Sequence, residues 1–262
     1  MDNKEILEKA RNENLGRLNK NTYGTIMKII GYQNRNNIIV EFQDEYKIKK
    51  KATKQQFLKG TIKNPYDKEV YNIGYLGDGK YNKKDYIKIY NTWKGMLERC
   101  YDLYKINKEL SYIDCIVCDE WHNFQNFAKW YEENYYECNN ERMELDKDIL
   151  YKNNKIYSPK TCIFVPKRIN CLFTKSNKTR DIYPIGVSWK RDNNKFQAQC
   201  HIEINNKKTM KYLGLYNTIE DAFVHYKQFK ENYIKQVADE YKDSIPIKLY
   251  NALYSWEVEI ND

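Results

Sequence analysis

Residues 144–174 constrain the fold more than any other part of the chain, because they place two extended runs, a turn and the start of a helix in one short stretch. The run ELDKDIL is the first extended segment, KNN is the turn, YSPKTCIFVP is a second strand entered through Ser-Pro, and VPKRINCLF begins a helix. Turn residues between short apolar runs predict this order. Short strands interspersed with helices indicate an α+β fold.

The length and composition indicate a folded protein of two or three compact modules. The chain has 262 residues, of which 41% are hydrophobic and 15% aromatic, which is too apolar for a disordered chain even with 31% charged residues. We find neither an apolar run long enough to cross a bilayer nor an export signal, so we expect a cytoplasmic protein with no membrane partner. In that compartment the seven cysteines are expected to be reduced thiols.

The net charge of +9 is distributed unevenly along the chain. Residues 46–63 contain seven lysines and no acid, residues 119–148 contain nine acids and three bases, and residues 151–211 contain fourteen bases and three acids. Basic segments neutralise phosphates and release their counterions, whereas an acidic segment suits a metal ion. The pattern favours a nucleic-acid partner, and three solvated faces are the alternative.

Residues 1–66 are predicted to form a helix and a small basic β-barrel. The segments GTIMKIIGY, NNIIVEFQD and YKIKKKATKQQFLKG alternate as strands do, with a turn at residues 34–37. The residues expected to fill the barrel are Tyr23, Ile26, Ile38, Val40, Phe42 and Phe57, and the lysines expected to project from it are Lys47, Lys49, Lys51 and Lys54. The pattern resembles Src-homology-three-like barrels, which bind proteins as readily as nucleic acid. Among these lysines Lys49, Lys51 and Lys54 are candidate DNA contacts.

A glycine-rich stretch and two helices are expected next. Residues 67–85 carry Gly74, Gly77 and Gly79 among tyrosines and polar residues, which predicts a linker or long loop. A first helix would bury the stripe formed by Tyr90, Trp93, Leu97, Cys100 and Tyr104. A second helix is predicted to start near Asn123 and to direct Phe124, Phe127, Ala128 and Tyr131 inward.

The central part of the chain contains four motifs found together in one family. The motif residues are Trp93, Met96, Arg99, Cys100 and Tyr101; Val117, Cys118, Glu120, Trp121 and Phe124; Leu145, Asp146 and Asp148; and Tyr157, Ser158, Pro159 and Cys162. With them, residues 86–178 resemble the phage-type HNH endonucleases, whose catalytic unit is a ββα-metal finger. The resemblance implies metal-dependent nicking of DNA in a host bacterial cell.

The resemblance also assigns roles to four residues of the finger. It implies that Asp146 and Asn170 hold a divalent Mg or Mn ion, which stabilises charge on the scissile phosphate. The family's general-base histidine is replaced by Lys147, and a lysine with the ordinary pKa of about 10.4 is protonated at neutral pH. Asp148 is the alternative base or extra ligand, although a regular strand would direct it to the opposite face from Asp146. These four are the candidate catalytic residues.

Histidine and cysteine supply few other candidate ligands. None of the three histidines lies in the finger, and His122 is predicted to be a surface or capping residue. Cys115 and Cys118 form one C-x-x-C pair, and the spacing of Cys138, Cys162 and Cys171 is irregular. A structural zinc usually needs a second closely spaced pair, so we expect buried thiols and no structural zinc.

Residues 179–243 are predicted to form three strands followed by one long helix, with a tail over residues 244–262. The turns are at Asn193–Asn194 and Asn205–Asn206, and Thr218 caps the helix with Asp221 three residues later. The apolar stripe of the helix is formed by Ala222, Tyr226, Phe229, Tyr233 and Val237. Three strands packed on one helix complete the α+β architecture.

This last module resembles the ethylene-response-factor (APETALA) DNA-binding domain, in which the sheet enters the major groove of double-stranded DNA. The resemblance is carried by Gly186-Val187, Phe196-Gln197-Ala198, Tyr212-Leu213-Gly214 and residues 218–222. Strand alternation directs Phe196, Ala198, Cys200 and Ile202 to the helix. The residues left to face DNA are Ser188, Lys190, Gln197, Gln199, His201, Lys208 and Tyr212. Glutamine can bind adenine through two hydrogen bonds, and lysine can bind guanine or phosphate. A merely polar solvent face is the alternative.

The sequence is therefore compatible with two functions. The first is a phage-type HNH endonuclease that uses a divalent metal at Asp146 and Asn170. The second is an inactive HNH frame that binds DNA or blocks a host nucleic-acid or defence protein. Lys147 favours the second function, and the acids of the finger favour the first.

Overall fold

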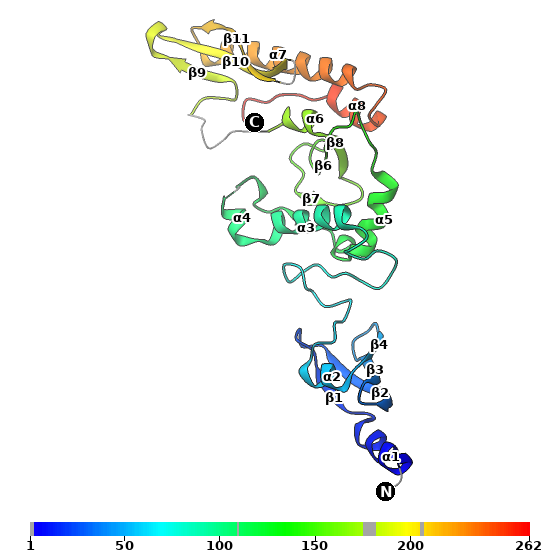
Figure 1. The fold of residues 1–262 in the computed structure, drawn as a ribbon. Coiled ribbons are helices and arrows are strands. Elements are labelled where there is room, and N and C mark those ends of the chain that lie inside the picture. Colours follow the sequence, from blue (N-terminus) through cyan, green and yellow to red (C-terminus); the bar gives the residue numbers. More distant parts are fainter. Residues whose placement is uncertain (1–2, 109, 175–181, 205–206) are drawn as a thin grey trace. The chain divides into compact units, whose positions relative to one another are not determined.

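The computed structural model describes residues 3–108, 110–174, 182–204 and 207–262 (Figure 1). The chain divides into two compact units. One unit comprises residues Met1–Glu133 and Lys155–Ser158, and the other comprises Asn134–Asn154 and Pro159–Asp262. Each unit combines helices with short strands, which confirms the α+β class.

The first unit begins with a helix and a four-stranded sheet and continues with further helices. Its elements are α1 (Asn3–Asn14), β1 (Leu18–Lys20), β2 (Ile26–Asn34), β3 (Asn37–Phe42), β4 (Lys49–Ala52), α2 (Lys54–Lys59), α3 (Ile87–Tyr101), α4 (Leu103–Lys108), β5 (Ile116–Val117), α5 (Phe124–Asn134, which begins in this unit) and β7 (Ile156–Tyr157). Strands β5 and β7 pair in parallel.

The N-terminal strands form an open antiparallel sheet in the order β1-β2-β3-β4 (Figure 1). Among the described residues no pairing joins β4 back to β1, so the expected closed barrel is not confirmed. The core residues Ile38, Val40, Phe42 and Phe57 are fully buried, as predicted.

Two residues assigned to that core are instead exposed. Tyr23 is 50% exposed and Ile26 is 43% exposed, whereas Met27 and Ile29 are buried. The sequence IMKII offers two apolar alternations, and a shift of one residue exchanges the faces of a strand. The charged side chain of Lys28 decides between them, because only the alternation through Met27 leaves it in solvent.

Residues 67–85 pack against the helices of this unit and are not a free linker. Tyr75 lies beside Asn123 in an isolated parallel bridge: its amide donates to the carbonyl oxygen of His122, and its carbonyl oxygen accepts from the amide of Phe124. The side chain of Gln125 donates hydrogen bonds to the carbonyl oxygens of Leu76 and Tyr81. It also accepts a hydrogen bond from the backbone amide of Tyr81. A Cβ added at Gly74 would lie 2.5 Å from Leu97, so this backbone lies directly on α3.

The two predicted helices are present as α3 and α5. All four residues expected on the inner face of α5 are buried, and the side chain of Asn123 accepts a hydrogen bond from the amide of Gln125 at its start. The stripe of α3 is buried as far as Cys100, but Tyr104 is 76% exposed, so its assignment was wrong. Helix α3 ends before Asp102. The side chain of Asp102 accepts a hydrogen bond from the amide of Tyr104 and caps the start of α4.

The second unit contains two further sheets and three helices. Its elements are β6 (Met143–Asp146), β8 (Ile163–Pro166), α6 (Lys167–Cys171), β9 (Val187–Lys190), β10 (Lys195–Ile204), β11 (Lys207–Tyr216), α7 (Ile219–Glu240) and α8 (Ile247–Tyr254). Strands β6 and β8 are antiparallel and lead into α6, which is the predicted finger order. The expected second strand over YSPKTCIFVP is divided into β7 and β8.

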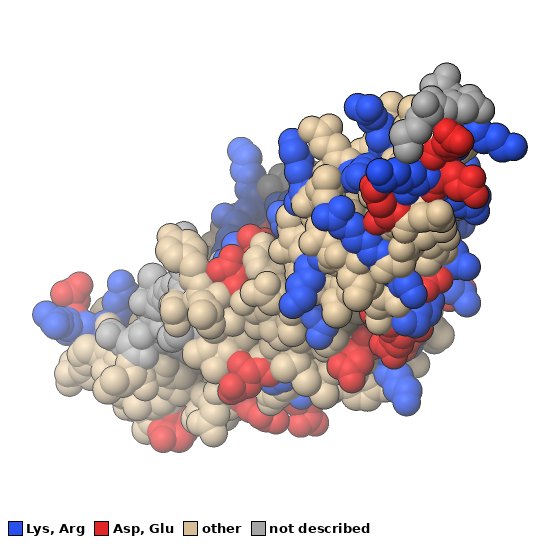
Figure 2. Space-filling model, turned by 90° about the horizontal axis from the view of Figure 1, so that it is seen from below, with Lys and Arg blue, Asp and Glu red and all other residues tan. Residues whose placement is uncertain are grey.

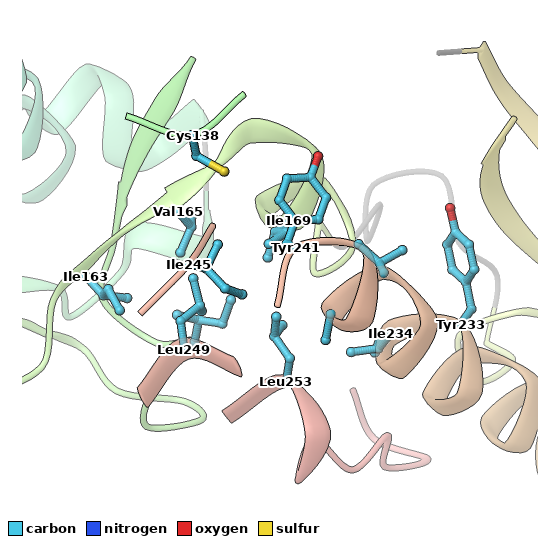
Figure 3. Close-up of a cluster of buried hydrophobic side chains, with 13 residues drawn as sticks. Cys138, Ile163, Val165, Ile169, Tyr233, Ile234, Tyr241, Ile245, Leu249 and Leu253 are labelled. Atoms are coloured by element: carbon cyan, nitrogen blue, oxygen red, sulfur yellow. The ribbon is translucent and has the colours of Figure 1, made fainter. Parts of the chain in front are cut away.

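The finger and the C-terminal helices share one hydrophobic core (Figure 3). Ile163 and Val165 come from β8, Ile169 from α6, Ile234 from α7, and Leu253 from α8. These side chains point toward one another in Figure 3. The predicted boundary at residues 178/179 therefore falls inside one unit, and residues 244–262 contribute a core helix where a tail was expected.

Strands β9, β10 and β11 form an antiparallel sheet in the order β11-β10-β9, with its inner face on α7. Ala198 and Cys200 are buried against the helix, with Phe196 and Ile202 partly buried beside them, as predicted. The turn expected at residues 205–206 lies outside the described residues.

The start of the sheet and the start of α7 depend on two local features. Thr218 accepts a hydrogen bond from the amide of Asp221 and caps α7, which confirms the predicted N-cap. Gly186 has φ of +79°, and a Cβ added there would lie 2.1 Å from the ring of Tyr226. Only glycine combines this backbone conformation with such a close approach to the helix.

Candidate functional site

The outer face of the C-terminal sheet gathers the predicted DNA-contacting residues. Antiparallel pairing places Gln197 opposite Ser188 and Gln199 opposite Tyr212, with His201 opposite Met210. The remaining predicted residues, Lys190 and Lys208, stand opposite Lys195 and Glu203 respectively. Because side chains alternate along each strand, these residues share the side of the sheet that faces away from α7.

A hydrogen bond joins the two glutamines at the centre of this face. The Nε2 of Gln197 donates to the Oε1 of Gln199 at 2.6 Å. Both side chains are half-buried, while Tyr212 beside them is 55% exposed. Neighbouring amides held in this way can offer an acceptor and a donor side by side, which is the pattern that an adenine edge requires in the major groove.

The sheet is basic, and its charge acts on the histidine. Residues 187–216 contain six lysines or arginines and two acids. Burial lowers the pKa of His201, and the nearby ammonium groups of Lys208 and Lys230 lower it further. A neutral imidazole on a basic face can accept or donate a hydrogen bond to a base edge without adding charge.

Two residues on this face were missed at the level of sequence. Lys195 lies opposite Lys190, and Met210 lies opposite His201 with 44% of its surface exposed. The strand alternation that assigned Gln197 and Gln199 to this face also assigns Lys195 to it, so the position of Lys195 could have been predicted from the sequence. Met210 carries no polar group and gave no such signal.

The N-terminal lysines predicted to contact DNA do not form one set. Lys49 and Lys51 are exposed on the same side of β4, and Lys49 lies 3.8 Å from the carboxylate of Glu41. Lys54 is the first residue of α2 and is half-buried.

The carboxylate of Asp146 caps the turn that follows β6. Its Oδ1 accepts from the backbone amides of Asp148 at 2.9 Å and Ile149 at 2.7 Å. Burial, followed by the charge of Asp148, raises the pKa of Asp146 to about 6, although these amide hydrogen bonds and Lys147 oppose the shift. Strand β6 ends at this residue, so the turn rather than strand alternation sets the direction of Asp148.

The other three predicted catalytic residues make contacts within the same unit. The side chain of Lys147 is 8% exposed, and its Nζ lies 3.1 Å from the Oδ2 of Asp148. The Nδ2 of Asn170 in α6 donates to the Oε2 of Glu144 in β6 at 2.6 Å. Lys147 and Asp148 form an ion pair, and a lysine in its protonated form cannot accept a proton from water.

The four predicted catalytic residues are engaged by backbone amides and by neighbouring side chains. Across the described part of the chain, no group of three or more His, Cys, Asp or Glu side chains is arranged to hold a metal ion. Asp146 is engaged by two backbone amides, and the neighbouring ammonium of Lys147 repels a second cation. The side-chain amide of Asn170 is engaged by the carboxylate of Glu144. In the described structure these side chains make contacts within the finger.

The histidine outside the finger has a local structural role. The Nε2 of His122 lies 3.1 Å from the carbonyl oxygen of Val117, and its ring packs edge-on against Tyr101. It belongs to the first unit, whereas Asp146 belongs to the second.

No disulfide joins the seven cysteines, all of which lie in the described residues. Cys115, Cys138 and Cys162 are buried, as expected. Cys171 is exposed, which differs from the expectation, because it occupies the last residue of the short helix α6.

Arg168 ties the finger helix to the C-terminal module and was missed by sequence reasoning. Its guanidinium lies 2.6 Å from Glu240 of α7 and 3.3 Å from Glu203 of β10, and it stacks over the ring of Tyr241. Neither its position after Pro166 nor its flanking residues identifies these distant partners. The network holds α6 against α7 and against strand β10 of the C-terminal sheet.

Comparisons with known proteins give no match. No family model, curated protein or solved structure matches this chain. Among the helices of the described residues, none combines the length and apolarity needed to cross a membrane.

Proposed function

We propose that this chain binds double-stranded DNA through the outer face of β9, β10 and β11, and that its HNH-like finger is a structural support with no catalytic role. The observation that carries the proposal is the register of this sheet. It brings Ser188, Gln197, Gln199, His201 and Tyr212 onto one basic, solvent-facing surface. The resemblance to ethylene-response-factor domains supports the same face.

The finger supports the proposal through its internal contacts. Asp146 caps a turn, Lys147 is buried beside Asp148, and Asn170 is bonded to Glu144. A nuclease needs these groups to bind metal and water, whereas a scaffold needs them to satisfy one another. The finger also shares its core with α7, the helix that carries the sheet. It therefore stabilises the binding module directly.

The direct test is selection of bound sequences from a random duplex library, followed by affinity measurements on the selected and a scrambled duplex. Replacing Gln197 and Gln199 with Ala is expected to reduce the preference for the selected site by about 1–3 kcal/mol per lost base contact. Binding to scrambled DNA depends mainly on phosphates and is expected to change little. The matched control replaces Gln228 and Gln236, which are exposed on α7.

The outcomes separate this function from its rivals. An equal loss of affinity for selected and scrambled DNA would refute the assignment of Gln197 and Gln199 as residues that contact the bases. Metal-dependent nicking of plasmid DNA that is abolished by a chelator and by Asp146→Ala would establish the endonuclease and refute the scaffold role. Failure of the wild-type protein to bind any duplex would refute DNA binding and direct the search to a protein partner.

A further inference from the structure

The outer face of the N-terminal sheet carries lysines that no part of the site uses. Lys20, Lys28, Lys49 and Lys51 are all exposed, and we call this set the lysine face. The opposite side of the same sheet is occupied by its own core, from Met27 to Ile62. Strand alternation therefore leaves the lysine face directed away from that core.

Each lysine except Lys49 stands opposite an exposed aliphatic side chain across a strand pair. Lys28 is opposite Leu18, Lys20 is opposite Ile26, and Lys51 is opposite Ile39. The aliphatic partners are 60%, 43% and 38% exposed respectively. Residues directly opposite in a sheet have Cβ atoms about 5 Å apart, close enough for the methylene stem of a lysine to lie along its neighbour. The face therefore alternates lysines with exposed aliphatic side chains.

One acid interrupts the face and does not neutralise it. Glu41 is opposite Lys28 on one side and Lys49 on the other. Its carboxylate lies 3.8 Å from the ammonium of Lys49, which is 62% exposed. Exposed pairs of this kind contribute little and exchange readily for another anion. The wider segment agrees, because residues 1–66 contain fourteen lysines or arginines and seven acids.

The chemistry of this face fits a repeating anion better than a single one. Lys49 and Lys51 are two residues apart on one strand, a separation of about 6.6 Å. A DNA strand presents one phosphate for about every 3.4 Å along the helix axis. The spacing of the two lysines therefore equals about two phosphate steps along the helix axis, so each lysine can contact a separate phosphate of one strand. Ammonium groups on flexible stems bind phosphates without reading bases. Figure 2 shows blue Lys and Arg side chains interspersed with red Asp and Glu and tan side chains on the viewed face.

We propose that the lysine face is a second, sequence-independent contact for the phosphate backbone of the DNA that the C-terminal sheet reads. This proposal rests on the DNA binding proposed above. Two contacts in one chain raise the effective concentration of the second once the first is bound. The N-terminal sheet thus adds affinity and salt dependence, while the C-terminal sheet supplies discrimination between sequences.

The test measures the salt dependence of binding by full-length protein carrying Lys28→Gln, Lys49→Gln and Lys51→Gln. Each lost phosphate contact lowers the slope of log K against log salt by about 0.9, so three contacts lower it by about 2.7. Between 50 and 200 mM salt the wild type then loses about 40-fold more affinity than the variant. The ratio of affinities for selected and scrambled duplexes is expected to stay the same.

Two control variants separate phosphate binding from net charge and from folding. Lys88→Gln, Lys94→Gln and Lys129→Gln remove the same charge from exposed positions of α3 and α5. Their slope is expected to fall by much less. Replacing Lys28, Lys49 and Lys51 with Arg retains the charges and is expected to retain the slope.

The outcomes distinguish this proposal from the proposed function. If the glutamine variant of the lysine face has the same salt slope as the control variant of α3 and α5, the phosphate contact is refuted and the lysine face is left to a protein partner. The proposal that Gln197 and Gln199 recognise DNA bases would still stand. A fall in the slope of the arginine variant also overturns the phosphate contact. Loss of sequence discrimination in the glutamine variant of the lysine face would show that this face reads bases, which contradicts the assignment of roles.

Discussion

Truncating one side chain of α8 tests whether the finger and the C-terminal sheet form one cooperative unit. Leu253 is fully buried in the core that also contains residues of β8, α6 and α7. Changing a fully buried leucine to alanine costs about 2.7–5 kcal/mol, because the lost transfer free energy adds to that of the cavity left behind. We expect Leu253→Ala to lower the free energy of unfolding by about 3 kcal/mol. This corresponds to a fall of about 10 °C in the melting temperature of a unit this size.

Hydrogen exchange followed by mass spectrometry is the assay that locates this loss. If the core is shared, peptides from β6 and β8 and peptides from β10 and β11 lose the same free energy of protection. The control is Ile247→Ala on the same helix, where the side chain is 71% exposed, and a change below about 0.5 kcal/mol is expected. Loss of protection in the finger with full protection retained in β10 and β11 would refute the single unit and restore the predicted boundary at residue 178.

Two further predictions concern local structure. In Gly186→Ala the new Cβ is strained by a left-handed φ of +79° and also clashes with the ring of Tyr226. In Gly16→Ala the backbone has the same φ, but no atom lies within 4 Å of the new Cβ. The second change is expected to cost about 1 kcal/mol of unfolding free energy and the first at least twice that. Chemical denaturation measures both, and equal costs would contradict the close packing of β9 on α7. The pKa of Asp146 is raised to about 6 from an ordinary value of about 3.9, so the folded state binds the extra proton. Stability is then expected to fall as pH rises from about 4 to 6. Asp146→Asn retains the acceptor for both turn amides and cannot ionise, so urea unfolding at pH 7 is expected to show a more stable protein with a flatter pH profile. A less stable variant would show that the carboxylate charge itself is needed.

The sequence predicted the elements well where one apolar pattern was possible. Residues 124–131 and the strand pattern of β10 allow a single amphipathic solution, and both were assigned to the correct face. Ile26 was assigned to the core from the strand alternation, which Met27 next to it satisfies equally well. Tyr104 has the spacing of the α3 stripe, but the side chain of Asp102 caps a new helix before it.

The shared core and the internal contacts of the finger lay beyond sequence reasoning for different reasons. Ile245, Leu249 and Leu253 are spaced by four residues, and Pro246 precedes the helix, so α8 was readable as an amphipathic helix. Its partners on β8 and α6 lie about eighty residues away in sequence, and periodicity carries no information about which faces meet. The roles of Asp146 and Asn170 depend on hydrogen-bond geometry, which a motif leaves open.

The length of α7 allows one helix to pack against both the C-terminal sheet and the finger. The first half of the helix, from Ala222 to Tyr226, packs under the sheet, and its second half, from Tyr233 to Ala238, packs against the finger and α8. A helix as long as α7 is not stable by itself, because the apolar face of each half needs another apolar surface to cover it. The finger supplies that surface for the second half, and Arg168 fixes the joint through Glu203 and Glu240. The proposed role of the finger as a support for DNA reading thus follows from what it holds in place.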